Sequence, residues 1–427
     1  MLPEGAVEAA PRGLRARLGA GFPALRHAYF RRYMAGQGIS LVGFWMQAVA
    51  QSWLVYRLSA SAFALGVVAS AAYLPVLCLA PVAGVIADRI DRHRLIVVTQ
   101  TLAMLLALGL GTLVALEVAT VPIVACFAFG LGVVGAFDLP TRQAFLVQMV
   151  GARDLPSAIA MNASVFNAAR VIGPALAGGL VASVGEAPCF FLNAASYLAV
   201  IWALLTMRFA RVAARGAAAP RRGELRSGVR YVRAHPPLGA LLLALGVVSG
   251  LALQFGVLMP VVAQRLFGSG ATGYGMLLTA VGVGAVLSAL QLASRHHDAA
   301  EHRRNLLLGL VAFGVGLLGL AVSPRLEVAL ACNVVAGLGM IRFTATTNTL
   351  LQLLVDDGYR GRVMGLHTVM FMGTSPAGSL LLGGLAQRLG AVPALVVSGS
   401  APLAAAVWLV PRLSPAALEG RGLHAGG

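Results

Sequence analysis

The chain has 427 residues, of which 59% are hydrophobic and only 11% are charged. Soluble domains carry about 25% charged residues, so this composition excludes an ordinary soluble globular protein and predicts an integral membrane protein. The formal net charge of +17 could indicate nucleic-acid binding, but the placement of the arginines described below favours a membrane protein instead.

Apolar runs of about 20 residues recur along the whole chain, and this length crosses about 30 Å of hydrocarbon as a helix. We therefore predict an all-α polytopic membrane protein with twelve spans. The predicted spans cover residues 33–55, 63–86, 95–116, 121–141, 158–184, 189–207, 238–260, 272–293, 306–322, 326–350, 363–386 and 392–410.

The arginines are distributed unevenly between the two sides of these spans. All 32 basic residues are arginine, and 26 of them lie in the two tails and in alternate loops. The positive-inside rule then predicts that both termini are cytoplasmic. Residues 1–28 lack the apolar core of a signal peptide and are predicted to form a cytoplasmic tail, as are residues 411–427.

The longest polar interruption, residues 208–237, predicts a cytoplasmic linker between two six-helix bundles at 29–207 and 238–410. Within it, Leu225, Val229 and Val232 recur at helical spacing. This pattern favours an amphipathic helix on the anionic inner leaflet over a solvated linker.

The two halves also resemble each other. The segment GGLVASVGEAP, which begins at Gly178, and GGLAQRLGAVP, which begins at Gly383, share the pattern GGL, four residues, Gly, two residues, Pro. The tripeptide Gly-Leu-Gly at 130–132 has a counterpart at 337–339. The matches predict a parallel repeat, an arrangement in which a substrate site lies between the halves near the bilayer midplane.

A charged hairpin, GVIADRIDRHR, joins the second and third predicted spans and carries Gly84, Asp88, Arg89, Arg92 and Arg94. It resembles the signature loop of the major facilitator superfamily of transporters, although Asp91 stands where that signature has a second glycine. The resemblance implies a gating relay in which Asp88 meets the eleventh span and Arg92 meets Asp138. The alternative is that Asp138 pairs only with Arg142, one helical turn away.

The fifth predicted span contains Arg170, Gly173, Pro174, Gly178 and Gly179. Proline bends a helix and glycines allow close helix approach, so the run predicts a kinked packing seam. It resembles the fifth-helix motif of facilitator-superfamily antiporters, with the spacing one residue longer. With the segments FDLPTRQAF at 137–145 and YRGRVMGL at 359–366, it resembles the branch of enterobactin exporters and macrolide efflux proteins.

Polar residues inside the spans are candidates for a substrate cavity. In the first span Gln37, Ser40, Phe44, Gln47 and Gln51 recur on one face, which favours cavity lining over interhelical hydrogen bonding alone. Further candidates are Gln254, Phe255, Arg342, Thr346, Thr349 and His367. A guanidinium inside a span is costly unless a partner or substrate uses it. We expect Arg342 to meet an anionic substrate group and Arg170 to act structurally.

The resemblance implies the major facilitator fold and a secondary active transporter. It would export a siderophore-like or drug-like molecule across the bacterial inner membrane by alternating access, with protons as coupling ion, as a monomer in lipid. An uptake permease or facilitator, or a non-transporting membrane sensor, is the alternative. The sequence contains no catalytic motif and no cofactor-binding loop, and the four cysteines lack metal-ligand spacing. We therefore expect no enzyme activity, no bound cofactor or metal, and no nucleic-acid partner.

Overall fold

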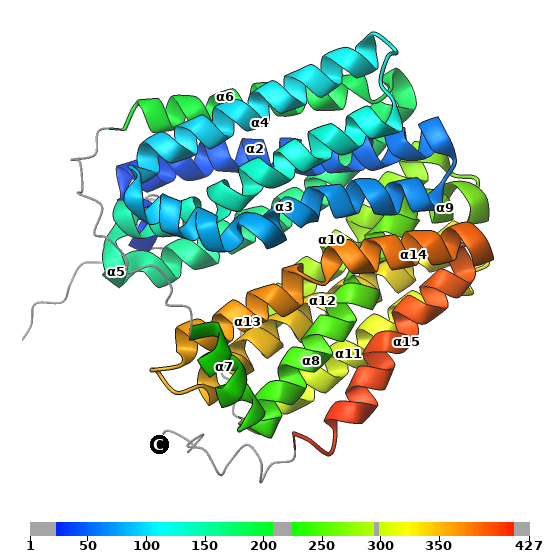
Figure 1. Cartoon of the computed structure of the whole chain (residues 1–427). Helices are drawn as coiled ribbons and strands as arrows, with labels where there is room; N and C mark the ends of the chain where they lie inside the picture. Colours follow the sequence, from blue (N-terminus) through cyan, green and yellow to red (C-terminus); the bar gives the residue numbers. More distant parts are fainter. Residues whose placement is uncertain (1–22, 208–223, 294–298, 414–427) are drawn as a thin grey trace, which may run out of the picture.

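The computed structural model describes residues 23–207, 224–293 and 299–413, and every element in these ranges is a helix. The prediction of an all-α protein is therefore confirmed for the described residues. Figure 1 shows two bundles of helices lying side by side.

The first bundle is built from one short 3-10 turn and five helices. They are η1 (Pro23–Arg26), α2 (Ala28–Ser59), α3 (Ala62–Arg89), α4 (Arg92–Ala115), α5 (Val121–Val184) and α6 (Ala187–Leu205). Local signals fix several helix starts. The Ser61 side chain accepts the Ala64 N–H at the start of α3, and Asp91 accepts the Arg94 N–H at the start of α4. Asp91, which departs from the superfamily signature, therefore acts as a helix cap.

The second bundle follows the linker helix α7 (Glu224–Arg233) and contains α8, a broken segment and six further helices. These are α8 (Pro236–Leu251), η2 (Leu253–Leu258), α9 (Met259–Val261), η3 (Val262–Leu266), α10 (Gly270–Ala293), α11 (Ala299–Ala321), α12 (Leu326–Leu354), α13 (Arg360–Met372), α14 (Ser375–Leu389) and α15 (Ala391–Leu409). The stretch from Pro236 to Leu266 and the pair α13 and α14 each form one candidate span.

Eleven helical stretches are long and apolar enough to cross a membrane. One of them, α5, has 64 residues, which at 1.5 Å per residue is about 96 Å, or three bilayer cores. Gly151 interrupts it with φ 73° and ψ 171°, a conformation that glycine adopts without steric cost. The helix therefore provides two spans, and the described chain has the twelve that the sequence predicts.

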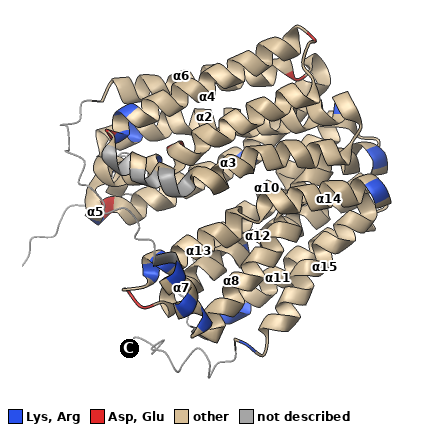
Figure 2. Ribbon diagram, viewed as in Figure 1, with Lys and Arg blue, Asp and Glu red and all other residues tan. Residues whose placement is uncertain are grey.

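Charged residues gather at the ends of the described helices, and the helix centres are almost free of them (Figure 2). The linker helix α7 carries exposed Arg226, Arg230 and Arg233. Its buried residues Tyr231 and Val232 pack in the protein core, and α7 contacts α8 and α13. The side chain of Leu225 and residues 208–223 lie outside the described residues. Contact of α7 with the inner leaflet stays a prediction.

The two bundles meet along two helix pairs, α3 with α14 and α5 with α10. Glycines allow these backbones to touch. A Cβ atom at Gly383 would lie 2.7 Å from the Ala62 carbonyl oxygen, and one at Gly275 would lie 2.7 Å from the Pro174 carbonyl oxygen. In Figure 1 the bundles lie together at the end that carries the α2–α3 and α14–α15 loops. They diverge toward the end that carries α7 and the α3–α4 loop.

Candidate functional site

A cavity of about 480 Å³ lies between the two bundles. Helices α2, α3, α5 and α6 line it from the first bundle, and η2, α10 and α13 line it from the second. Most of the lining is aliphatic or small. The polar lining residues are Gln47, Gln51, Ser52, Tyr73, Arg170, Tyr197, Gln254 and Tyr274. A largely apolar cavity of this size with a few polar groups is typical of a small-molecule site.

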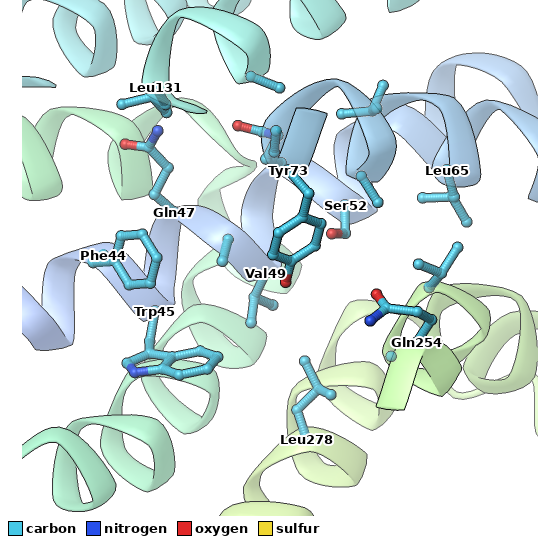
Figure 3. A pocket seen from close by; sticks show the side chains of 18 of the residues that line it. Phe44, Trp45, Gln47, Val49, Ser52, Leu65, Tyr73, Leu131, Gln254 and Leu278 are labelled. Carbon is cyan, nitrogen blue, oxygen red and sulfur yellow. The ribbon is translucent and has the colours of Figure 1, made fainter. Parts of the chain in front are cut away.

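The polar face of α2 contributes three of the predicted residues, Phe44, Gln47 and Gln51, to the lining. Figure 3 shows the first two of them beside the cavity. Gln47 also accepts a hydrogen bond of 2.6 Å from the Asn193 side chain on α6. Cavity lining and interhelical hydrogen bonding therefore occur together at Gln47. Gln37 is 3% exposed and does not line this cavity.

Arg170 on α5 lies in the cavity wall. Its guanidinium carbon is 5.5 Å from the centre of the Trp45 ring, which is a cation–π contact. Its Nη2 donates to the Met340 sulfur on α12 at 3.5 Å, so Arg170 also touches the second bundle. Among the lining residues that the structure describes, Arg170 is the one charged side chain.

Gln254 joins two broken helices of the second bundle. Its Nε2 donates to Ser375 Oγ at 2.9 Å, and its Oε1 accepts from Ser379 Oγ at 3.1 Å. Gln254 lies in η2 and both serines lie in α14, so the interruption of one span is tied to the interruption of another. Phe255 lines the cavity beside Gln254 and packs edge-on against Phe313.

The other predicted cavity residues lie elsewhere. Arg342 donates to Gln291 Oε1 at 2.7 Å, between α12 and α10. Thr346 is buried and Thr349 donates to the Ala345 carbonyl oxygen. His367 stacks on Phe371. None of these predicted residues belongs to the described lining, so their role in binding stays a prediction. Of the two arginines inside spans, it is Arg170 and not Arg342 that reaches the cavity.

Asp138 on α5 is the centre of a partly buried polar cluster. It pairs with Arg142 one helical turn away, and its Oδ1 accepts from Thr99 at 2.7 Å and from Gln100 at 2.9 Å. The pairing expected from the spacing is therefore present. The surroundings of Gly84 and the side chains of Asp88 and Arg89 are not among those that the structure describes, and the relay through these residues stays a prediction.

The fifth-helix motif lies at the contact between the bundles. Pro174 lines the cavity, and Gly178 faces Gly275 of α10 across the seam. Gly173 lies against the α2 backbone at Val42, and Gly179 has open space around it. The motif therefore positions Arg170 between α2 and the second bundle.

A second set of contacts closes the end of the molecule where the bundles meet, and the sequence analysis did not find it. Gln387 Oε1 accepts from the Ala62 N–H at 3.0 Å and from Ser61 Oγ at 3.1 Å. Arg265 Nη2 donates to the Ala60 carbonyl oxygen at 2.8 Å. We call Ala60, Ser61, Ala62, Arg265 and Gln387 the outer latch. These partners are more than 200 residues apart, and no local pattern reveals them.

Two helix bundles that cross a membrane and enclose a small-molecule cavity between them define a membrane transporter. The family model described as transmembrane secretion effector, of the major facilitator superfamily, matches residues 19–419. The chain belongs to this family, so it is a multi-pass membrane transporter and not an enzyme.

Curated relatives cover most of the chain. The staphyloferrin A transporter of Staphylococcus aureus is 25% identical over 369 residues, which are 86% of this chain and 92% of the relative. The multidrug efflux pump Tap of Mycolicibacterium fortuitum is 28% identical, over 83% of this chain and 87% of its own. The enterobactin exporter EntS of Shigella boydii is 26% identical, over 87% of this chain and 89% of its own.

Solved structures show the same fold. The nucleoside transporter NupG superposes with a TM-score of 0.70 at 13% identity, covering 91% of this chain and 99% of NupG. A bacterial homologue of the iron transporter ferroportin in an inward-facing state gives a TM-score of 0.69 at 18% identity. The superposition covers 91% of this chain and 99% of the homologue. The predicted major facilitator fold is confirmed.

Proposed function

We propose that this transporter exports a small organic molecule across the bacterial inner membrane by alternating access. The observation that carries the proposal is the cavity shared by both bundles, together with the outer-latch contacts that join the bundles at one end. A rocking motion of one bundle against the other would open that end and close the opposite one.

Export is the direction that the relatives support. Two of the relatives named above are a multidrug efflux pump and an enterobactin exporter, and a third is a staphyloferrin A transporter. The substrate we propose is therefore a siderophore-like or drug-like molecule. A cavity of about 480 Å³ falls in the range of about 300–1,000 Å³ that suits such molecules.

We assign the diverging end to the cytoplasm, which makes this conformation inward-facing. The assignment rests on the arginines, because 26 of the 32 lie in the tails and the loops at one end. Both termini, and α7 with them, are then cytoplasmic, and the outer latch faces the periplasm.

Coupling to protons is proposed from the family resemblance. The described cavity lining contains no aspartate, glutamate or histidine, so the coupling proton would be carried outside it. We propose the carboxylate Asp138 as the carrier, because it is a partly buried acidic group inside a span and lies in the same helix as Arg170.

Efflux from proteoliposomes tests the function. Purified protein is reconstituted, the vesicles are loaded with a panel of siderophores and dyes, and efflux is followed with and without an imposed pH gradient. We expect at least one compound to leave faster than from protein-free vesicles, and faster still when protons can enter in exchange. Movement only in the opposite direction would identify an uptake permease. No movement of any compound would favour a sensor.

A further inference from the structure

We infer that the cavity takes an aromatic anion, meaning a small molecule with a carboxylate or an acidic phenol attached to an aromatic ring. Arg170 binds the anionic group, and the aromatic side chains beside it bind the ring. The inference rests on the proposed function, because it names the substrate class of the same cavity.

The charge of the cavity is the first argument. Arg170 contributes a full positive charge, and no aspartate or glutamate is present among the described lining residues to offset it. In surroundings of low dielectric constant, such a charge attracts anions and repels cations strongly. A cationic compound would meet repulsion and find no carboxylate in that lining.

The free hydrogen-bonding capacity of Arg170 is the second argument. A guanidinium has five N–H donors in a planar arrangement that matches a carboxylate. Its hydrogen-bond acceptor among the described residues is the sulfur of Met340 at 3.5 Å, and a thioether is a weak acceptor. A span holds an arginine at considerable cost unless a stronger partner pairs with it. An anionic substrate is such a partner.

The aromatic surroundings are the third argument. The Trp45 ring lies 5.5 Å from the Arg170 guanidinium and packs edge-on against Phe44 and Phe166. Phe44 and Tyr73 both line the cavity and are 48% and 38% exposed. Figure 3 shows Phe44, Trp45 and Tyr73 around the same space. Exposed rings beside a guanidinium can stack on an aromatic ligand while its acidic group is held.

Arg170 also lies where the two bundles touch. Its side chain reaches Met340 of α12, and a Cβ at Gly282 of α10 would lie 2.9 Å from its backbone oxygen. An anion that draws the guanidinium away from Met340 therefore changes a contact between the bundles. A ligand shifts a conformational equilibrium only through such differential contacts.

Three probes that share one naphthalene ring and differ in charge test the inference: 2-naphthoate, 2-naphthamide and 2-naphthylmethylammonium. Their binding to the purified full-length protein in detergent is measured by isothermal titration calorimetry, with micelles alone as blank. We expect naphthoate to bind at least about 10-fold more tightly than the amide, as a charge-assisted hydrogen bond does, and the ammonium to bind most weakly. Equal binding of the three, a preference for the ammonium, or binding of none overturns the inference.

Variants then assign the preference to Arg170. Arg170→Gln should abolish the preference for naphthoate and leave the affinity for the amide unchanged, whereas Arg170→Lys should retain part of the preference. Arg388→Gln, the matched change at an exposed arginine that does not line the cavity, should behave as wild type. If Arg170→Gln keeps the preference, or loses the amide as well, Arg170 is not the anion site.

Trp45→Leu provides a second measurement in a protein that keeps the guanidinium. It should weaken all three probes and preserve their order, and an unchanged affinity for all of them would remove the aromatic part of the inference. Transport is scored separately in proteoliposomes. A protein that binds naphthoate as expected but moves no compound contradicts the proposed function alone, and a protein that exports only neutral or cationic compounds contradicts the inference alone.

Discussion

The side-chain oxygen of Gln387 accepts the backbone N–H of Ala62 at 3.0 Å, and this hydrogen bond joins the two bundles. Ala62 is the first residue of α3, and its N–H has no acceptor within the helix because helix N-termini leave such groups free. A side chain of the second bundle therefore completes the cap of a helix in the first. Opening this end exposes that N–H.

Removing the Gln387 contacts of the outer latch should favour the conformation that is open at this end of the molecule. Gln387→Ala deletes two hydrogen bonds, each with a net contribution of about 1 kcal/mol. The equilibrium should then shift by about 5- to 30-fold toward molecules that are open at this end. Spin labels on the α2–α3 and α14–α15 loops, measured by electron–electron double resonance, should show a larger long-distance population. Arg388→Ala, a change at an adjacent exposed residue, should leave the distances as in wild type. Identical distances in both variants would show that the Gln387 contacts of the latch contribute nothing.

Two neighbouring glycines of α14 offer a matched test of the seam. A Cβ at Gly383 would lie 2.7 Å from the Ala62 carbonyl oxygen, whereas one at Gly384 would meet nothing closer than Phe63 at 3.8 Å. We expect Gly383→Ala to separate α3 from α14 and reduce efflux at least severalfold. Gly384→Ala should transport normally. Equal rates in the two variants would mean that the bundles do not need this close approach.

The ion pair of Arg57 and Glu186 should stabilise the first bundle. Arg57 Nε and Nη2 lie 2.7 and 3.1 Å from the carboxylate oxygens of Glu186, which is 5% exposed. Arg57→Ala leaves a buried carboxylate unpaired. Breaking a fully buried pair lowers the free energy of unfolding by about 3–5 kcal/mol. Because the Arg57 side chain is half exposed, we expect a smaller decrease of about 1–2 kcal/mol. The double variant Arg57→Ala/Glu186→Ala should be less destabilised than Arg57→Ala alone in thermal unfolding. Strict additivity would show that the pair contributes no coupling.

Asp138 should be needed for coupling to protons. Asp138→Asn removes the charge beside Arg142 and keeps a side chain of similar size. We expect the variant to fold and to exchange substrate across the membrane without a gradient, but to lose acceleration by a pH gradient. Asp154→Asn, on the same helix and paired with His27 at 2.7 Å, is the control. Gradient-driven efflux at the wild-type rate in Asp138→Asn would assign the proton to another group.

The sequence predicts the helices well and their contacts poorly. Apolar runs predict the spans because a helix needs about 20 apolar residues to cross the hydrocarbon core. Gly151 divides α5 between its two spans. The stripe of Phe44, Gln47 and Gln51 indicated one cavity wall, since polar groups on a membrane helix avoid lipid. The sequence did not predict which of Arg170 and Arg342 lines the cavity. That depends on how α5 and α12 are rotated against their neighbours, and the residue pattern of each helix alone does not show this rotation. Gln387 gave no signal because its partner in α3 is 325 residues away.

Transport through the cavity is the central claim, and blocking the cavity tests it most directly. Gln51 lines the cavity, so Gln51→Cys is made in a protein whose four native cysteines are replaced by alanine. A bulky membrane-impermeant maleimide is then applied to inverted membrane vesicles or to intact cells. Export is measured as uptake of substrate into the inverted vesicles or as its efflux from the cells. We predict that the reagent stops efflux when it reaches the cytoplasmic face, that it acts far more slowly from outside, and that substrate protects the cysteine. Full labelling with an unchanged rate of efflux would contradict the account.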